Sequence, residues 1–431
     1  MINVISKILW AVSTALILLV GLFFTYKFNF VQFHFKKILN SCFMGKKTDG
    51  ISPLSSLMMV LAGRIGVGSI AGVALAIYIG GAGSILWMWF ISLITASCTF
   101  LETVLGNKYK EKDYGNIYKG GPAYYIKNGL NNYKLGWIYS FFIIISYIGA
   151  FLSIQSNTIT RSINDIVYVP NIVVAIAICL FTGIIILGGI KKISSVTNKL
   201  VPLMIVLYSL TAIYITFKNI NILGHIMYMI ISTAFNFKPF LTGFLSSFIV
   251  GVQRGIFASE AGLGTGSIAS STTSDNNAIK NGYLQILGIY ITSFIICTST
   301  AFIILASDYT NLNLNDINGI EITLYAFNYH LGSVGRYIVF ISIILFSFST
   351  ILTGYYYAES SIKYMKNKIS NNIILILKIT TIIMLFIGSL LSAHILWKLV
   401  DIFVAILIII NSISLFLLSD KIKYEMQKDS T

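Results

Sequence analysis

Long apolar segments separated by short polar ones make up almost all of this sequence. A helix that crosses a membrane needs roughly 20 apolar residues, and about eleven segments come close to that length. They are Ile8–Phe24, Leu54–Gly80, Ile85–Leu105, Gly136–Ser156, Ile172–Leu187, Val201–Phe217, Phe240–Ser271, Ile286–Leu305, Val334–Tyr357, Ile373–Leu391 and Ile395–Leu418. The pattern predicts an all-α integral membrane protein with about eleven transmembrane helices.

Two of these segments, Leu54–Gly80 and Phe240–Ser271, are longer than one straight span requires. They contain nearly the same short motif, GVGSIA at Gly66–Ala71 and GTGSIA at Gly264–Ala269. Glycine disfavours a helix, and backbone groups freed inside a bilayer must be satisfied by protein or by a water-filled cavity. Corresponding breaks in two halves of a chain point to a transporter's substrate site. The sequence therefore predicts two broken helices.

The spans after the first one divide into two groups of five. With the amino terminus outside, Leu54–Gly80 runs outward and Phe240–Ser271 runs inward, which predicts a 5+5 inverted repeat. The predicted organisation is an extra N-terminal helix and cytoplasmic loop at 1–50, a first repeat at 51–217, an external interfacial connection at 218–239, a second repeat at 240–419 and a cytoplasmic tail at 420–431.

Composition and charge agree with this class. Hydrophobic residues make up 56% of the chain and charged residues 10%, against about 25% charged residues in a soluble domain. The net charge is +15. With the amino terminus outside and the carboxyl terminus inside, about 21 Lys and Arg fall in cytoplasmic segments and about 5 in external ones. The basic excess therefore indicates a multi-pass plasma-membrane topology in a lipid bilayer, and not a nucleic-acid partner.

The sequence lacks the motifs of an intramembrane enzyme. It has no HExxH pattern, no histidine deep within a predicted span and no cysteine pair with metal-ligand spacing. We therefore expect no enzyme activity, no catalytic residue, no cofactor and no transition-metal site.

The first glycine cluster predicts a site for an anion and a cation. If the helix unwinds there, its second half begins with free N–H groups and the positive end of the helix dipole, which favour a carboxylate. The amides of Val67 and Gly68 can point at that carboxylate, and the Ser69 hydroxyl can cap the half-helix or touch the ligand. The released carbonyls of Ala62 and Ile65 suit a small hard cation. Close helix packing through small residues is the alternative.

The second cluster predicts a complementary site. Its glycines, Gly264 among them, free the carbonyls from Phe257 to Ser259, which can accept hydrogen bonds from an ammonium group. Phe257 and Leu263 would line an apolar pocket for a side chain. Amides for a carboxylate and carbonyls for an amine together describe an α-amino acid.

A third group of polar atoms lies in the ninth span. The Phe346 carbonyl and the Ser349 and Thr350 hydroxyls are spaced i, i+3 and i+4, so they share one helical face. With the carbonyls of Ala62 and Ile65 they would supply neutral oxygens for a monovalent cation. The alternative is that these hydroxyls only bond to the preceding turn.

Charged residues within the spans are candidates for ion pairs or gates. They are Arg64, Arg254, Glu260 and Asp401. Asp401 can pair with Lys398 at i+3 along its own helix, and proton coupling through Glu260 or Asp401 stays open. Glu102 lies near a cytoplasmic helix end, where we expect it to be solvated.

Several motifs resemble those of a known family. They are GRIGVGSIAGVALAI (63–77), GGPAYYI (120–126), GVQRGIFASEAGLGTGSIA (251–269), CTSTAFIIL (297–305), FSFSTILTGYYYAE (346–359) and WKLVDI (397–402). From about Ser52 to Ser419 the chain resembles the alanine/glycine:cation symporters, within the leucine-transporter-type fold of the APC superfamily. The resemblance implies uptake of a small neutral amino acid with sodium as the coupling ion.

Three positions depart from that family pattern. The family usually has Asn where this chain has Ser69, often Asp where it has Thr292, and usually Trp where it has Gly354. The first two departures weaken a cation site on the second and eighth spans and favour the one at Ser349 and Thr350. Replacing Trp by Gly removes about 200 Å² of contact surface, so we expect Gly354 to adjoin an enlarged pocket for an amino acid bulkier than alanine.

Two other functions are compatible with the same residues. One is a proton-coupled amino-acid carrier, and the other is a membrane amino-acid sensor that does not transport. The sequence predicts neither the individual amino acid nor the oligomeric state.

Overall fold

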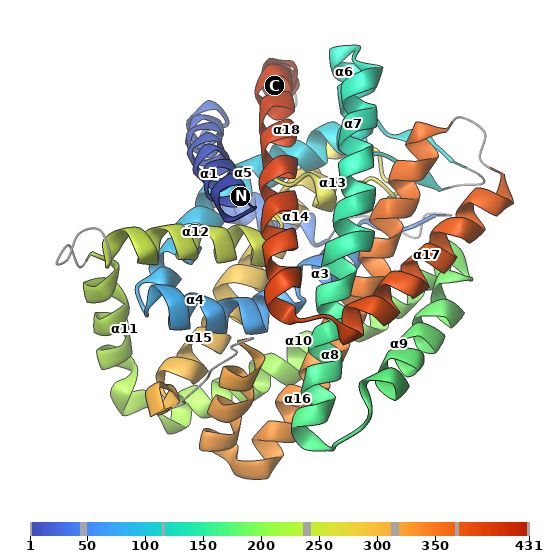
Figure 1. Ribbon diagram of the computed structural model, residues 1–431. Helices are drawn as coiled ribbons and strands as arrows, with labels where there is room; N and C mark the ends of the chain where they lie inside the picture. The colour runs from blue at the N-terminus through green and yellow to red at the C-terminus, as the bar shows by residue number, and fades with distance from the viewer. Residues whose placement is uncertain are drawn as a thin grey trace.

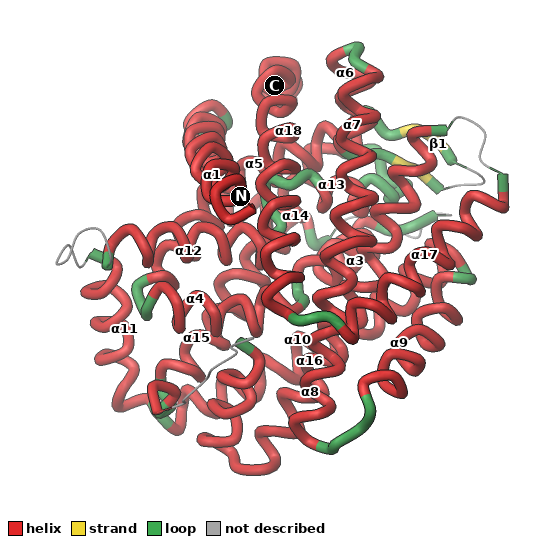
Figure 2. Tube along the Cα trace, in the orientation of Figure 1, coloured by secondary structure: helices red, strands yellow, loops and turns green. Residues whose placement is uncertain are grey.

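The computed structural model describes residues 2–43, 50–113, 117–235, 243–311, 319–366 and 370–428. Within these ranges the chain is almost entirely helical, as Figures 1 and 2 show. The exceptions are connecting turns, one isolated β-bridge and the short antiparallel pair of β1 (Glu111–Lys112) with β2 (Tyr118–Lys119).

The regular helices share one property: nearly all of them are apolar along most of their length. In chain order they are α1 (Ile2–Lys27), α2 (Phe35–Ser41), α3 (Pro53–Arg64), α4 (Val73–Gly80), α5 (Ser84–Lys108), α6 (Pro122–Leu130), α7 (Tyr133–Ile144), α8 (Leu152–Ile166), α9 (Asn171–Ile186), α10 (Gly189–Lys218), α11 (Ile220–Ala234), α12 (Phe244–Ser259), α13 (Thr265–Ser270), α14 (Ala278–Ile289), α15 (Thr298–Leu305), α16 (Ile320–Met365), α17 (Asn371–Leu390) and α18 (Ala393–Lys428). Wider π-helical turns join some of them: η2 (Gly68–Gly72), η3 (Ile145–Phe151) and η4 (Tyr290–Cys297). Short 3₁₀ turns are η1 (Val31–Phe33) and η5 (Tyr309–Asn311).

The all-helical membrane architecture is confirmed. In the described ranges 8 helices are long and apolar enough to cross a membrane, or up to 9 if the bent pair of α3 with Gly68–Gly80 is one span. α9, α11 and α12 are apolar but shorter. Length and composition therefore support fewer spans than the eleven expected from the sequence.

Several predicted boundaries do not coincide with the ends of helices. α16 joins the expected ninth span to the segment before it, with a kink at Gly332, whose φ is 62°. The expected tail from residue 420 continues α18 as far as Lys428. α11 lies within the predicted connection 218–239, but the boundary at 239/240 lies outside the described residues.

Capping residues explain where two central helices begin. The Ser52 hydroxyl accepts a hydrogen bond of 3.1 Å from the Ser55 amide, and Pro53 follows at the first helical position of α3. The Asn277 side chain accepts one of 2.9 Å from the Lys280 amide at the start of α14. Such caps satisfy amides that a helix leaves open at its N-terminus.

Contacts distant in sequence bring many helix ends to one face of the molecule, the upper face in Figure 1. Lys27 at the end of α1 contacts Asp420 of α18 at 2.7 Å. Ile51, just before α3, forms a parallel bridge with Thr273, just after α13. α3 therefore begins at the face where α13 ends, and the two broken segments run in opposite directions.

The opposite face carries its own contacts. Arg336 of α16 pairs with Asp165 of α8 at 2.8 Å, and Lys218 at the end of α10 donates to the His330 carbonyl at 3.1 Å. The interior between the two faces is one continuous apolar core that includes residues of α1, α3, α5, α12, α16 and α18.

Candidate functional site

The first predicted break is present. α3 ends at Arg64, the chain turns at Ile65 (φ −83°, ψ 79°), and helical structure resumes near Gly68 after a bend of 54°. The amide of Val67 donates to Oε1 of Gln155 on α8 at 3.2 Å. Gln155 is 2% exposed. The oxygen of an uncharged, buried side-chain amide therefore accepts a hydrogen bond from one of the N–H groups that the break releases.

The second predicted break is also present and is longer. α12 ends at Ser259, and α13 begins at Thr265. Glu260, Gly262 and Gly264 between them have φ of 51°, 84° and 89°, a region that glycine enters at little cost. Within the described chain, no backbone amide donates to the carbonyls from Phe257 to Ser259.

A carboxylate from another helix holds this second break. Glu102 of α5 accepts a hydrogen bond of 2.6 Å from the Asn411 side chain, and the backbone amides of Gly262 and Gly264 lie near its carboxylate. Asn411 of α18 also donates to the Gly262 carbonyl at 2.9 Å. The prediction of a solvated Glu102 is wrong: the residue is 1% exposed, because α12, α13 and α14 pack around α5.

The Glu260 carboxylate lies where the two breaks meet. It accepts hydrogen bonds from the Tyr147 hydroxyl at 2.8 Å and the Thr265 hydroxyl at 3.0 Å. A Cβ placed on Gly63 would lie 3.4 Å from Glu260 Oε2. The end of α3 is therefore in contact with the second break, and the two interrupted helices face each other.

Four of the five predicted cation ligands are brought together. The Thr350 and Ser349 hydroxyls donate to the Ala62 carbonyl at 2.9 and 3.4 Å. Both also donate to the Phe346 carbonyl, at 3.0 and 2.9 Å. The fifth ligand, Ile65, occupies the turn that ends α3. The group consists of neutral oxygens from two helices and is not only a set of bonds within one turn.

Aromatic rings enclose one side of the breaks. Tyr147 stacks on Phe151 with ring centroids 4.5 Å apart, and Phe151 lies 5.4 Å from Phe257. Phe257 in turn packs edge-on against Trp397 at 5.0 Å. A Cβ on Gly68 would lie 2.8 Å from the Phe257 ring, so Phe257 closes directly on the first break.

The enlarged pocket expected beside Gly354 is absent. A Cβ placed there would lie 2.8 Å from the Leu152 side chain and 2.9 Å from the Tyr147 ring. These two side chains from η3 and α8 occupy the space that a larger residue would fill. The reason for expecting a bulkier substrate is therefore removed.

Two arginines in the spans have different surroundings. Arg254 of α12 forms two contacts of 3.2 Å with Asp401 of α18, and its guanidinium lies 4.6 Å from the centre of the Trp397 ring. The expected i+3 pairing of Asp401 with Lys398 is therefore wrong. Arg64 is 2% exposed and donates to the Gln285 carbonyl at 3.2 Å. Its Nε and Nη2 atoms have no hydrogen-bond partner among the described residues.

The remaining predicted residues line the two breaks through backbone and hydroxyl groups. The Ser69 carbonyl accepts from Thr300 at 2.8 Å, and the Leu263 carbonyl accepts from Tyr139 at 2.7 Å. The Ser259 hydroxyl accepts from the Ala261 amide at 3.4 Å. The hydroxyl of Thr292, one of the three residues that depart from the family pattern, donates within its own helix to the Gly288 carbonyl at 2.9 Å.

Sequence reasoning did not identify Gln155 or the capping role of Glu102. Each is a polar side chain near the end of a predicted apolar span, and this position is the one feature of the sequence that indicates a polar contact there. Their partners, Val67 and Gly262, are 88 and 160 positions away, so no spacing rule connects them.

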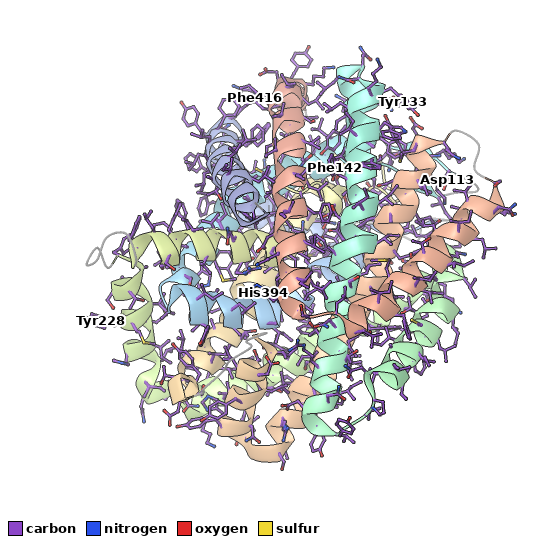
Figure 3. All side chains as sticks on the ribbon, in the orientation of Figure 1. Asp113, Tyr133, Phe142, Tyr228, His394 and Phe416 are labelled. Carbon is purple, nitrogen blue, oxygen red and sulfur yellow. The ribbon has the colours of Figure 1, made fainter. Side chains whose placement is uncertain are left out.

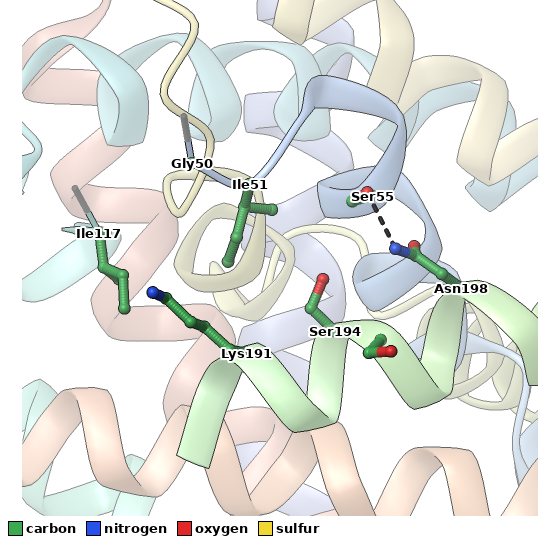
Figure 4. Close-up of a pocket in the computed structure, with 8 residues that line it drawn as sticks. Gly50, Ile51, Ser55, Ile117, Lys191, Ser194 and Asn198 are labelled. Carbon is green, nitrogen blue, oxygen red and sulfur yellow. Dashed lines mark hydrogen bonds between the residues drawn. The ribbon is translucent and has the colours of Figure 1, made fainter. Parts of the chain in front are cut away.

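A separate cavity of ≈ 290 Å³ opens where α3 begins, between that helix and α10, as Figure 4 shows. Its lining includes Lys191, Ser194 and Asn198, and the Asn198 side chain donates to the Ser55 hydroxyl at 2.9 Å. Further along α10, Met204 contacts the Ser349 hydroxyl at 3.7 Å. The cavity and the predicted cation ligands therefore share α3, while the other ligands belong to α16, which packs on α10 through this contact.

Comparison with known proteins shows the family of this chain. The profile of the sodium:alanine symporter family matches residues 1–429. The amino-acid carrier protein AlsT of Bacillus subtilis is 36% identical over 100% of this chain and 91% of its own length. The probable sodium/glutamine symporter GlnT of B. subtilis is 34% identical over 100% of this chain and 90% of its length. The sodium/alanine symporter AgcS of Methanococcus maripaludis is 30% identical over 97% of this chain and 94% of its length.

These proteins are named as transporters and not as enzymes, and their similarity covers both breaks and the hydroxyl-bearing helix α16. The chain is a multi-pass membrane protein of the sodium:alanine symporter family.

Proposed function

We propose that this protein carries a small neutral amino acid into the cell together with sodium by alternating access. In this proposal the eleven predicted spans form an extra first helix and a 5+5 inverted repeat of the leucine-transporter type. The amino terminus is outside the plasma membrane and the carboxyl terminus is cytoplasmic. The upper face in Figure 1, which carries the ends of α5, α16 and α18, is then the cytoplasmic face.

The observation that carries the proposal is the contact between the two breaks. The amides of Val67 and Gly68 suit a substrate carboxylate, and the carbonyls from Phe257 to Ser259 suit its ammonium group. The Val67 amide now donates to Gln155 at 3.2 Å, and the incoming carboxylate would take over that donor. In this proposal Ser69, Leu263 and Gly264 also contact the substrate, whereas Gly354 adjoins the Tyr147 and Leu152 side chains that close the site.

The size of the enclosure supports a small substrate. Phe257 lies against Gly68, and Tyr147 fills the space beside Gly354. A bound amino acid must displace part of this aromatic wall, which favours alanine or glycine over larger side chains. Competition by unlabelled amino acids of increasing size against alanine uptake measures this limit directly.

We assign sodium to the oxygens of Ala62, Ile65, Phe346, Ser349 and Thr350. Carbonyl and hydroxyl oxygens can coordinate a monovalent cation, and these ligands carry no charge of their own. The buried charged groups near the breaks are Arg64, Arg254, Glu102, Glu260 and Asp401. If all are ionised, the two cations face three anions, so one bound cation balances the site. The cavity between α3 and α10 marks the side on which this cation would leave.

The test is alanine uptake into proteoliposomes with and without an inward sodium gradient. In the double variant Ser349→Ala with Thr350→Val, we expect sodium stimulation to be lost while the protein remains folded in the bilayer. The control is Ser342→Ala with Thr381→Val, which removes two buried hydroxyls that bond only to their own helices. Undiminished sodium-dependent uptake by the first variant would refute the assignment. Binding of alanine without any accumulation would favour a sensor over a carrier.

One observation favours a proton as an alternative coupling ion. Both partners of the Glu260 carboxylate, Tyr147 and Thr265, are hydroxyls, and a hydroxyl can donate or accept. Their geometry therefore accommodates Glu260 with or without a proton, whereas the partners of Glu102 are N–H donors only. Uptake driven by a pH gradient in sodium-free buffer, and abolished in Glu260→Gln, would establish proton coupling.

A further inference from the structure

A basic cavity lies where α16 ends and α17 begins. Its volume is ≈ 660 Å³. The lining residues combine charged, amide and apolar groups: Asp113, Lys119, Glu359, Lys363, Lys366, Asn371, Asn372, Ile374, Leu375 and Lys378. Figure 3 labels Asp113 at this place, near the upper end of α16 and the start of α17.

Both carboxylates of the cavity are already engaged by lysines. Lys363 contacts Asp113 at 3.1 Å and Glu359 at 3.0 Å. Lys119 contacts the other oxygen of Asp113 at 3.7 Å. No described carboxylate therefore remains in this cavity for the other lysines.

Lys366 and Lys378 supply the surplus positive charge. Neither forms an ion pair or hydrogen bond with any residue that the structure describes. Lys378 lies seven residues into α17, about 10 Å along a helix axis, between apolar neighbours. A lysine at that depth extends its ammonium group toward the headgroup layer.

The wall beside Lys378 is apolar and is not covered by the described protein. In the most apolar window of α17 only 28% of residues are buried within the protein, and Leu375, Ile376 and Ile379 are 50%, 62% and 48% exposed. Leu375 lies at i−3 from Lys378 and Ile374 at i−4, so they share its helical face. Charge and apolar surface therefore meet within one cavity at the edge of the bilayer.

We propose that this cavity binds the headgroup of an anionic phospholipid. Its phosphate would contact Lys366 and Lys378, and its acyl chains would lie along the exposed apolar face of α17. Basic pockets between membrane helices on the cytoplasmic side suit such headgroups. The proposal depends on the membrane assignment made above but not on the transported solute or the coupling ion, so failure of either proposal is visible separately.

The experiment is thermal unfolding of the purified protein in detergent with three additives. These are short-chain phosphatidylglycerol, short-chain phosphatidylcholine and inorganic phosphate. We expect phosphatidylglycerol to raise the unfolding temperature and the other two to leave it unchanged. In Lys366→Gln with Lys378→Gln, the concentration of phosphatidylglycerol needed for half the shift should rise about thirtyfold. Each basic residue near an anionic lipid surface contributes a factor of roughly five to six in affinity, and the two factors multiply.

Two further variants make the result specific. Lys366→Arg with Lys378→Arg keeps both charges and should keep the shift. Lys36→Gln with Lys280→Gln removes two exposed lysines at the same face, on α2 and α14, and should also keep it. The proposal would be overturned if phosphatidylglycerol raised the unfolding temperature of Lys366→Gln with Lys378→Gln as it does that of the unmodified protein. An equal shift from phosphatidylcholine would also overturn it. An equal shift from inorganic phosphate would show a site for soluble anions instead.

Discussion

The pair of Arg254 and Asp401 connects α12 to α18 next to the first break, and we expect it to be strongly coupled. Both guanidinium contacts are 3.2 Å long, and the side chains are 8% and 17% exposed. Removing one partner of such a buried pair leaves an uncompensated charge and costs about 3–5 kcal/mol. The Trp397 ring, 4.6 Å from the guanidinium, would offset about 1 kcal/mol of that cost.

We therefore expect Asp401→Asn to lower the free energy of unfolding by about 3 kcal/mol. The double variant Arg254→Met with Asp401→Leu buries no charge, so it should lie within about 1 kcal/mol of the unmodified protein. The assay is unfolding by sodium dodecyl sulfate in mixed micelles, with both single variants and the double variant. A coupling energy of about 2 kcal/mol or more is expected from this cycle.

An exposed pair of similar length gives the control. Arg336 and Asp165 lie 2.8 Å apart, but their side chains are 40% and 35% exposed. Asp165→Asn should therefore change stability by less than about 1 kcal/mol. Additive effects of the substitutions at Arg254 and Asp401, or an equally small effect of Asp401→Asn, would refute the argument that burial makes the first pair strong.

Three more predictions concern Glu102, Gly264 and Lys110, which follows the end of α5. Glu102→Gln places an NH₂ group among N–H donors, including that of Asn411, and should cost about 1–3 kcal/mol of stability; a thermal unfolding curve equal to that of the unmodified protein would contradict this. Gly264 has φ of 89°, and a Cβ there would lie 2.3 Å from a proline side chain, whereas a Cβ on Gly149 would have no atom within 4 Å. Uptake should therefore be lost in Gly264→Ala and kept in Gly149→Ala. Burial lowers the pKa of Lys110 from 10.5 to about 8, so between these two pH values the unfolded chain binds more protons and stability should rise with pH. Lys110→Met should flatten that rise in the unfolding temperature, and an unchanged slope would argue against it.

The sequence by itself determined the class, the positions of the two breaks and which oxygens share one face of the ninth predicted span. The repeated hexapeptide located both interruptions because glycine's cost in a helix is local and independent of the fold. The i, i+3, i+4 spacing placed Phe346, Ser349 and Thr350 on one face, because helix geometry fixes that face before any packing occurs. These oxygens then met Ala62, as the structure shows.

The tertiary structure alone decided which side chains contact one another. Asp401 pairs with Arg254, 147 positions away, and not with its helical neighbour Lys398. Glu102 is buried because other helices close around it, although its place near a helix end suggested water. The space expected beside Gly354 disappears because Tyr147, on another helix, fills it. In each case the outcome depends on which helices pack together, and an apolar pattern specifies that a segment avoids water but not whether lipid or another helix covers it.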